Sequence, residues 1–123
     1  MANLKAYNTA FKNARRLYHL RLQQNQLTQD EEVEVRRLAT ELKNILMDID
    51  VNVPGSHCPL WPYFVGGAES TSQIERSYFY SRLESIWIKT GSRNPNVAMR
   101  GLLYIWSLGE GVNWAIQIEN LQR

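Results

Sequence analysis

The stretch CPLWPYFVGGAES, residues 58–70, lies between two runs of sequence that are predicted to be helical. It combines a cysteine, two prolines and three aromatic residues with the pair Gly66 and Gly67. Proline is tolerated only near the start of a helix, and glycine lets the backbone turn sharply. The stretch therefore predicts one helical turn over residues 60–65, with Pro62 near its start and a bend at the two glycines, buried between longer helices.

Five longer helices are predicted around this turn. Their ranges are residues 4–24, 28–47, 72–89, 94–108 and 113–121. Thr28 with Glu31, and Ser72 with Glu75, each form a capping box in which side chains satisfy free backbone N–H groups. Asn113 is the expected cap of the last helix. The other end signals are Asn94 with Pro95 at the start of the fourth helix, and Gly91, Gly109 and Gly111 as stops.

Apolar residues recur at steps of three and four within these ranges, which gives most of the helices one buried face. The expected buried residues are Leu4, Tyr7, Phe11, Ala14 and Tyr18; Val35, Leu38, Leu42 and Ile45; Ile74, Phe79, Leu83, Ile86 and Trp87; and Trp114, Ile118 and Leu121. No stretch alternates with period two for long enough to form a strand. We therefore expect an all-α single domain over residues 1–123, an irregular bundle of about five helices plus one short helical turn.

Residues 97–108 depart from this amphipathic pattern, because they are apolar in nearly every direction. Polar residues, chiefly Arg100 and Ser107, interrupt them only rarely. A helix that is hydrophobic all round is normally covered on all sides, and four other short helices can hardly cover it. Two interpretations remain open: the chain is part of a larger helical domain or pairs with a partner, or it is a tightly packed monomer.

The composition is that of a globular domain. The 123 residues are 44% hydrophobic and 21% charged, with a net charge of +2. No stretch approaches the roughly 20 apolar residues of a membrane span, and the N-terminus lacks a signal-peptide pattern, so we expect an intracellular protein that is not bound to a membrane. Cys58 is the single cysteine, so this chain alone forms neither a disulfide nor a cysteine-based zinc cluster.

Ser56, His57 and Cys58 stand side by side and could suggest a nucleophile with its base, or a pair of metal ligands. Adjacent loop residues rarely aim at one another, and His19 is the only other histidine. We therefore predict that the chain is not an enzyme and has no catalytic, cofactor or metal site. Cys58 is interpreted as a small apolar residue that enters the core.

Charged residues offer two further candidates. A basic strip for phosphates or an acidic partner could form from Arg15, Arg16, Arg21, Arg36 and Arg37. Neighbouring acids favour an ordinary solvated face instead; these are Glu31, Glu32, Glu34 and Glu41. Glu69 and Arg76 lie close to one another across a helix start, which predicts a partly buried ion pair with a structural role.

Four segments carry a resemblance to a known family: LWPYFVGGAEST, ERSYFYSRLESIW, NVAMRGLLYIW and GVNWAIQI. Together they resemble the C-terminal part of the fungal-specific transcription factor domain, the helical regulatory region of fungal zinc-cluster transcription factors. The matching positions are Trp61 and Pro62; Gly67, Ala68 and Glu69; Glu75 and Arg76; Leu83; Asn96, Val97 and Trp106; and Asn113 and Trp114. The segment YNTAFKNARRLYHLRL is also similar to the family, so the resemblance covers nearly the whole chain.

The resemblance implies a nuclear protein that regulates transcription. Family members bind DNA through an N-terminal cluster of six cysteines and zinc, which this chain lacks, so we expect no direct DNA binding and interpret the chain as a truncated member. It implies an interaction module that contacts a protein partner or a full-length relative through the helices at 72–89 and 94–108.

Two alternatives stay open beside the interaction module. One is an inducer-sensing domain that binds a small apolar molecule beneath the tryptophans, and the other is a non-functional fragment. The candidate surface for a partner or ligand consists of Trp61, Phe79, Trp87, Tyr104, Trp106 and Trp114. Large aromatic residues at helical spacing are also typical of a core.

Overall fold

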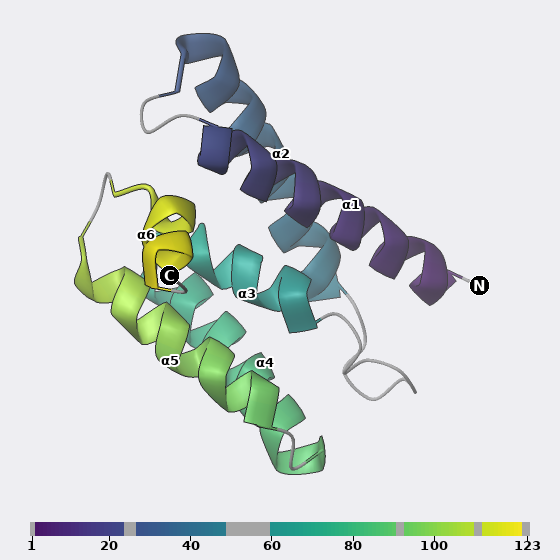
Figure 1. Ribbon diagram of the computed structural model, residues 1–123. Coiled ribbons are helices and arrows are strands. Elements are labelled where there is room, and N and C mark those ends of the chain that lie inside the picture. Colours follow the sequence, from purple (N-terminus) through teal and green to yellow (C-terminus); the bar gives the residue numbers. More distant parts are fainter. Residues whose placement is uncertain (1, 24–26, 49–59, 91–92, 110–111, 122–123) are drawn as a thin grey trace.

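The computed structural model describes residues 2–23, 27–48, 60–90, 93–109 and 112–121. Within these residues the chain forms six helices and no strand (Figure 1), which confirms the all-α prediction. The helices are α1 (Ala2–Gln23), α2 (Gln29–Asp48), α3 (Leu60–Ala68), α4 (Gln73–Thr90), α5 (Arg93–Ser107) and α6 (Trp114–Leu121).

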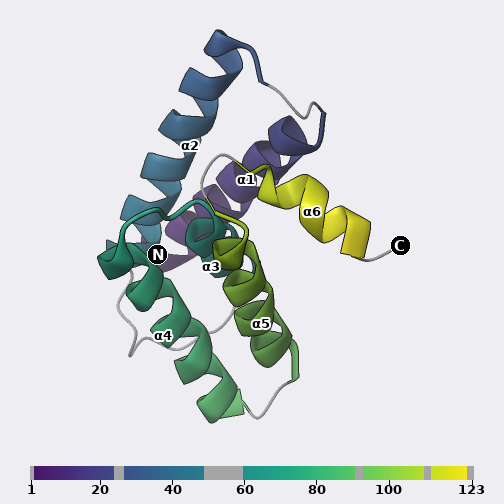
Figure 2. The same ribbon diagram turned by 90° about the vertical axis from the view of Figure 1, so that its left-hand side faces the viewer.

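The helices are arranged as two hairpins joined by a central helix. α1 packs against α2, and α4 packs against α5, while α3 contacts all four of these helices. The short α6 lies against α1 and α5 (Figures 1 and 2) and so connects the two hairpins a second time. The contacts of α6 with α1 and α5 therefore help to hold the bundle together.

The α1–α2 hairpin has a narrow apolar seam. On α1, Ala10 and Ala14 are fully buried, and side chains this small let two helices approach closely. The buried residues of the seam are Tyr7, Ala10, Ala14 and Leu17 on α1 and Val35, Leu38, Ala39, Leu42 and Leu46 on α2. Phe11 and Tyr18, expected in the buried face, lie half-buried at its edges instead.

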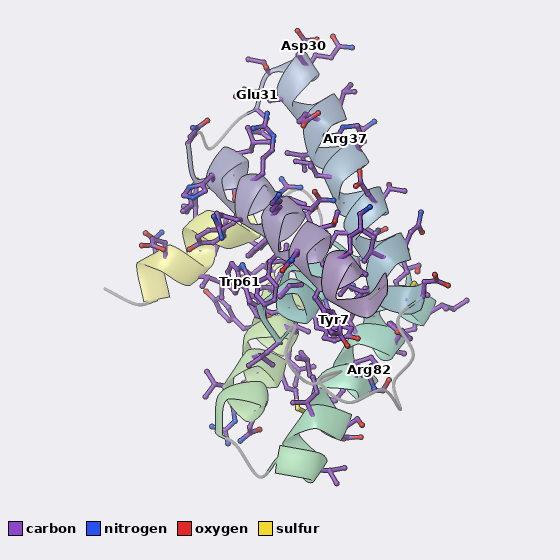
Figure 3. The ribbon with its side chains drawn as sticks, turned by 90° about the vertical axis from the view of Figure 1, so that its right-hand side faces the viewer. Tyr7, Asp30, Glu31, Arg37, Trp61 and Arg82 are labelled. Carbon is purple, nitrogen blue, oxygen red and sulfur yellow. The ribbon has the colours of Figure 1, made fainter. Side chains whose placement is uncertain are left out.

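The expected caps lie at three helix starts. At α2, the Thr28 N–H donates to Glu31 Oε1 at 2.9 Å and the Glu31 N–H donates to Thr28 Oγ1 at 3.2 Å, which is the predicted capping box. Figure 3 shows Glu31 at the start of α2. At α4, the Glu75 N–H donates to Ser72 Oγ at 3.1 Å. At α6, Asn113 Oδ1 accepts from the Ile116 N–H at 3.4 Å. These local predictions are confirmed.

The central helix α3 is longer than the sequence suggested. The expected bend at Gly66 and Gly67 was wrong, because both residues lie inside α3 and are buried. A Cβ atom on Gly66 would lie 2.8 Å from Phe79 Cε1, and one on Gly67 would lie 2.8 Å from Leu102 Cδ1. The two glycines therefore allow α4 and α5 to pack directly onto the α3 backbone.

The second hairpin differs from expectation at its edges. Ile74 was expected in the buried face of α4, yet it is 81% exposed. α5 begins at Arg93, so the expected cap Asn94 and Pro95 lie in its first turn, where the missing N–H of proline costs no intrahelical hydrogen bond. α5 ends before Gly109, which has a φ of 89° and is therefore the stop that the sequence predicted.

Some predictions fall on residues outside the described ranges. These are Ser56, His57, Cys58, Gly91 and Gly111, together with the side chains of Leu4, Trp87 and Leu121. Of the helices that the structure describes, none has the combination of length and apolar character needed to cross a membrane.

Candidate functional site

A cleft of about 760 Å³ opens where the ends of several helices meet. Its walls come from the C-terminal end of α1, the α3–α4 junction, the C-terminal end of α5 and the start of α6. The lining residues are Arg21, Leu27, Glu32, Ala68, Glu69, Ser70, Thr71, Arg76, Ile105, Trp106, Gly109, Val112, Asn113 and Trp114. Two of the candidate tryptophans, Trp106 and Trp114, therefore line a cleft, as the ligand hypothesis requires, but several charged side chains line it with them.

The carboxylate of Glu69 accepts several hydrogen bonds in this cleft. It accepts two from Arg21, from Nε at 2.6 Å and from Nη2 at 2.8 Å. The indole Nε1 of Trp114 donates to Oε2 of the same carboxylate at 2.7 Å. The side chain of Glu69 is only 6% exposed and that of Arg21 is 23% exposed. Such paired, charge-assisted hydrogen bonds fix the relative positions of α1, α3 and α6.

Glu69 forms its ion pair with a different arginine from the one expected. The sequence pairs Glu69 with Arg76, whereas the carboxylate is held by Arg21, which had been assigned to the solvated face of the first helix. Arg76 instead donates from Nε to the carbonyl oxygen of Ser70 at 3.1 Å. The α3–α4 connection and the first residues of α4 separate Glu69 from Arg76, whereas Arg21 reaches the carboxylate because α3 packs against α1.

Arg76 lies over an aromatic ring. Its guanidinium carbon lies 5.4 Å from the ring centroid of Trp106, within the range of a cation–π interaction. The Trp106 indole in turn donates to the carbonyl oxygen of Gly67 at 3.0 Å, and Ser70 Oγ donates to that of Gly66 at 2.7 Å. Side chains thus satisfy the carbonyl groups that the end of α3 leaves free.

The remaining candidate aromatics separate into buried and exposed groups. Trp61 packs against Tyr18 and Phe64, with ring centroids 5.2 and 5.8 Å apart. Phe79 is fully buried in the core, whereas Tyr104 lies on the outside of α5. Trp61 and Phe79 are therefore packing residues in this structure. The side chain of Trp87 lies outside the described part, so its prediction stays open.

Tyr18 links the aromatic packing to the last helix. Its hydroxyl group donates to Glu119 Oε2 at 2.7 Å, and its ring centroid lies 5.8 Å from that of Trp114. Burial, together with the hydrogen bond to the Glu119 carboxylate, raises the pKa of Tyr18 to about 12. Tyr18 is therefore a neutral donor at physiological pH, with a structural role between α1 and α6.

A second candidate surface lies on the outer side of the α4–α5 hairpin. Its large apolar residues are Ile74 and Ile88 on α4 and Val97, Leu103 and Tyr104 on α5, all of them exposed. We call this set the outer face. Ile88 is 73% exposed and Leu103 is 52% exposed. This agrees with the sequence-based inference that the neighbouring helices leave part of α5 uncovered.

The inner side of the same hairpin contains a buried charge. Arg82 is only 6% exposed, and its guanidinium carbon lies 5.3 Å from the ring centroid of Tyr63. Among the described residues it has no carboxylate partner, and its Nε has no hydrogen-bond acceptor. The sequence offered a signal for this position, because Arg82 shares a helix face with Phe79, Leu83 and Ile86, which are all buried.

The arginines of the first hairpin form solvated ion pairs. Arg37 Nη2 lies 2.8 Å from Glu34 Oε1 and Nη1 lies 3.2 Å from Glu41 Oε2, while Arg16 Nε reaches Glu34 at 3.2 Å. The hydrogen bond from Arg37, supported by Arg16, lowers the pKa of Glu34 to about 2. Arg16, Arg36 and Arg37 are therefore paired with acids, as the solvated-face interpretation expected, whereas Arg15 makes no ion pair with another described residue. Figure 3 shows Arg37 on α2.

In the residues that the structure describes, no group of three or more histidine, cysteine, aspartate or glutamate side chains is placed to hold a metal ion.

A protein-family model described as fungal specific transcription factor domain matches residues 2–119 of the 123-residue chain. No curated protein and no solved structure matches the chain significantly. The match confirms the resemblance drawn from the four sequence segments.

Proposed function

Because this chain belongs to the fungal specific transcription factor domain family, a family of transcription regulation rather than of enzymes, we propose that it is a regulatory module that acts by protein contact. In this proposal the module works in the nucleus and binds a second copy of the same domain. That copy is either another such chain or the corresponding part of a longer relative.

The outer face of α4 and α5 is the observation that carries the proposal. Its apolar residues lie on the side of each helix opposite the buried residues Phe79, Leu83, Leu102 and Ile105. Single exposed hydrophobic residues are normal, but several on two adjacent helices are typical of interaction surfaces.

Charge favours a second copy as the occupant. On α4 the exposed residues between Ile74 and Ile88 include Glu84, and on α5 those between Val97 and Tyr104 include Arg100. Neither charge makes an ion pair with another described residue. In a symmetric dimer α4 of one copy meets α5 of the other, so each Glu84 faces an Arg100 of its partner and two pairs form.

The size of the face predicts weak pairing. With 18 residues in α4 and 15 in α5, the helices are about 27 and 22 Å long. Two such helices side by side would bury about 500 Å² per copy, or about 1,000 Å² in total, which is the lower end for specific interfaces. We therefore expect association that depends on protein concentration.

The oligomeric state tests the proposal directly. Sedimentation equilibrium of the purified chain should show a reversible monomer–dimer equilibrium. Leu103→Glu places a charge in the centre of the outer face and should leave the chain monomeric. The matched control is Val33→Glu, because Val33 on α2 is 59% exposed and lies outside the outer face; this variant should dimerise like the unmodified chain.

A charge exchange tests the arrangement of the dimer. Glu84→Arg and Arg100→Glu should each weaken association, because each places like charges opposite one another, and the double variant should restore it. A chain that stays monomeric at every concentration would contradict the proposal. So would association that Leu103→Glu leaves unchanged.

A reporter assay in a fungal host tests regulation. Expression of the chain should change the output of a family member that responds to it, and Leu103→Glu should lose the effect while Val33→Glu keeps it. A fluorescent fusion should accumulate in the nucleus. If the dimerisation-defective variant regulates as well as the unmodified chain, contact through the outer face is not the mechanism.

A further inference from the structure

Arg76, in the cleft at the α3–α4 junction, is a cation that makes no ion pair with another described residue. Of the two arginines of the cleft, Arg21 is paired with Glu69 through two hydrogen bonds. The other lining acid, Glu32, is on the exposed side of α2, where its nearest cation is Arg36 at 4.0 Å. Arg76 makes no ion pair with any residue that the structure describes. Because Glu69 pairs with Arg21, Arg76 is left as a cation of the cleft without an ion pair to another described residue.

The position of the Arg76 guanidinium is fixed by two contacts. Nε donates to the Ser70 carbonyl oxygen at 3.1 Å, and the guanidinium lies over the Trp106 ring. Because Nε is already engaged, the terminal Nη groups remain as donors. Such a fork of N–H groups matches the two oxygens of a carboxylate. Little side-chain freedom is lost when a ligand binds to a guanidinium that is already held in place.

The surroundings of Arg76 combine polar groups with an apolar wall. Ile105, Trp106 and Trp114 line the same cleft, and both indole N–H groups are already hydrogen-bonded within the protein. Trp114 is only 2% exposed and Ile105 only 6%, so the half-buried Trp106 provides most of the apolar surface that a ligand can contact. A volume of about 760 Å³ is in the range of small-molecule sites, roughly 300–1,000 Å³.

We infer that this cleft binds a small organic carboxylate, with the carboxylate on Arg76 and an apolar body against Trp106. The inference does not depend on dimerisation through the outer face. It changes the ligand class suggested by the sequence, a small apolar molecule, because a neutral apolar compound would leave the Arg76 charge without a partner. Membership of a regulatory family makes the cleft a site through which such a metabolite controls the module.

The test uses three probes with the full chain. These are 3-phenylpropionate, its neutral amide 3-phenylpropanamide, and inorganic phosphate, with ionic strength kept constant by sodium chloride. Binding is followed by tryptophan fluorescence excited at 295 nm and by shifts of the indole N–H signals of Trp106 and Trp114 in NMR spectra. We expect a saturable response to 3-phenylpropionate and binding of the amide and phosphate that is weaker by tenfold or more.

Variants connect the response to Arg76. Arg76→Met keeps an apolar side chain over Trp106 but removes the charge, and should weaken binding of 3-phenylpropionate about tenfold to a hundredfold. Arg76→Lys keeps the charge without the planar fork and should bind with intermediate affinity. Arg15→Met is the matched control, because Arg15 is exposed on α1 outside the cleft, and it should bind normally. Circular dichroism establishes that each variant is folded.

Several outcomes would overturn the inference. They are no saturable response to 3-phenylpropionate, equal binding of the amide, equal binding of phosphate, and unchanged affinity in a folded Arg76→Met variant. Leu103→Glu separates this inference from the proposed dimer: a monomeric variant that still binds 3-phenylpropionate supports the cleft alone, whereas a dimeric chain that does not bind it supports the outer face alone.

Discussion

The two hairpins of this protein distribute charged and apolar side chains in opposite ways. On α1 and α2 the seam is apolar, and the outside carries ion pairs such as Glu34 with Arg37. On α4 and α5 the arginine Arg82 lies inside, whereas Ile88 and Leu103 lie outside. Figure 3 shows the two arginines in different parts of the molecule, Arg37 on α2 and Arg82 on the α4 side.

This difference separates a surface adapted to water from one adapted to contact. Exposed ion pairs contribute little to stability, but they keep a helix surface soluble. The outer face of α4 and α5 lacks such ion pairs among the described residues and carries large apolar groups instead. In the proposed function the first hairpin therefore serves as support, and the second is the part that meets another molecule.

The largest effect is expected at the joint between the hairpins. Arg21→Met should lower the free energy of unfolding by about 3 kcal/mol, because it leaves the buried Glu69 carboxylate without its cation. Urea denaturation followed by circular dichroism measures this loss. The double variant Arg21→Met with Glu69→Gln should recover part of it. A loss below 1 kcal/mol would show that α1 is not anchored to α3 through this pair.

The next effect concerns α3 as the common support of both hairpins. Gly66→Val should lower the free energy of unfolding by about 2 kcal/mol, because the added side chain meets the Phe79 ring, whose nearest atom already lies 2.8 Å from a Cβ at this position. Thermal unfolding measures the change. Gly109→Ala is the control for steric crowding, because no atom lies within 4 Å of its Cβ position; its cost should come from its φ of 89° alone.

The same substitution in each hairpin gives the sharpest comparison. Arg82→Met should raise the free energy of unfolding by about 1 kcal/mol, because removal of a buried charge outweighs the lost cation–π contact with Tyr63. Urea denaturation compares it with Arg37→Met. If Arg82→Met destabilises the protein instead, the Arg82 charge is compensated in solution and the contrast between the hairpins is smaller than the structure indicates.

The smallest effect on stability is expected on the solvated side of the first hairpin. Arg37→Met should lower the stability only slightly at neutral pH, because an exposed ion pair is screened by solvent. It should raise the pKa of Glu34 from about 2 toward its ordinary value, because the hydrogen bond from Arg37 is the main cause of the lowering. Carboxyl NMR signals followed during acid titration measure this pKa.

The sign of the pH dependence follows from that lowered pKa. A carboxyl group with a folded-state pKa below its unfolded value contributes stability above the unfolded value, near 4.5, and loses it as the pH falls toward about 2. A Glu34 pKa that does not respond to Arg37→Met would mean that the two side chains are not paired in solution.

Local features of the fold were predictable from the sequence, and contacts between distant segments were not. The capping residues Thr28 and Asn113 were identified because a capping side chain and the backbone N–H that donates to it are only three residues apart. Arg21 and Glu69 are 48 residues apart, and no single-sequence pattern specifies which cation reaches a carboxylate across a bundle. The expected Glu69–Arg76 pair reflects closeness in sequence rather than in space.

The two glycines of α3 show a related limit. Gly66 and Gly67 predict a bend when only backbone freedom is considered, yet here they accommodate the side chains of Phe79 and Leu102. That role depends on partners from later helices. The apolar excess of α5 was more informative, because it predicted an uncovered surface without requiring knowledge of the partner, and Leu103 and Tyr104 are indeed exposed.

The hydrogen bond between Tyr18 and Glu119 also constrains how the protein is made. The two residues are 101 positions apart, so at a synthesis rate of about 5–20 residues per second Glu119 is added about 5–20 s after Tyr18. During that interval the aromatic side of α1 has already been synthesised while α6 has not. α1 is therefore the helix that a chaperone on the ribosome would have to shield for longest.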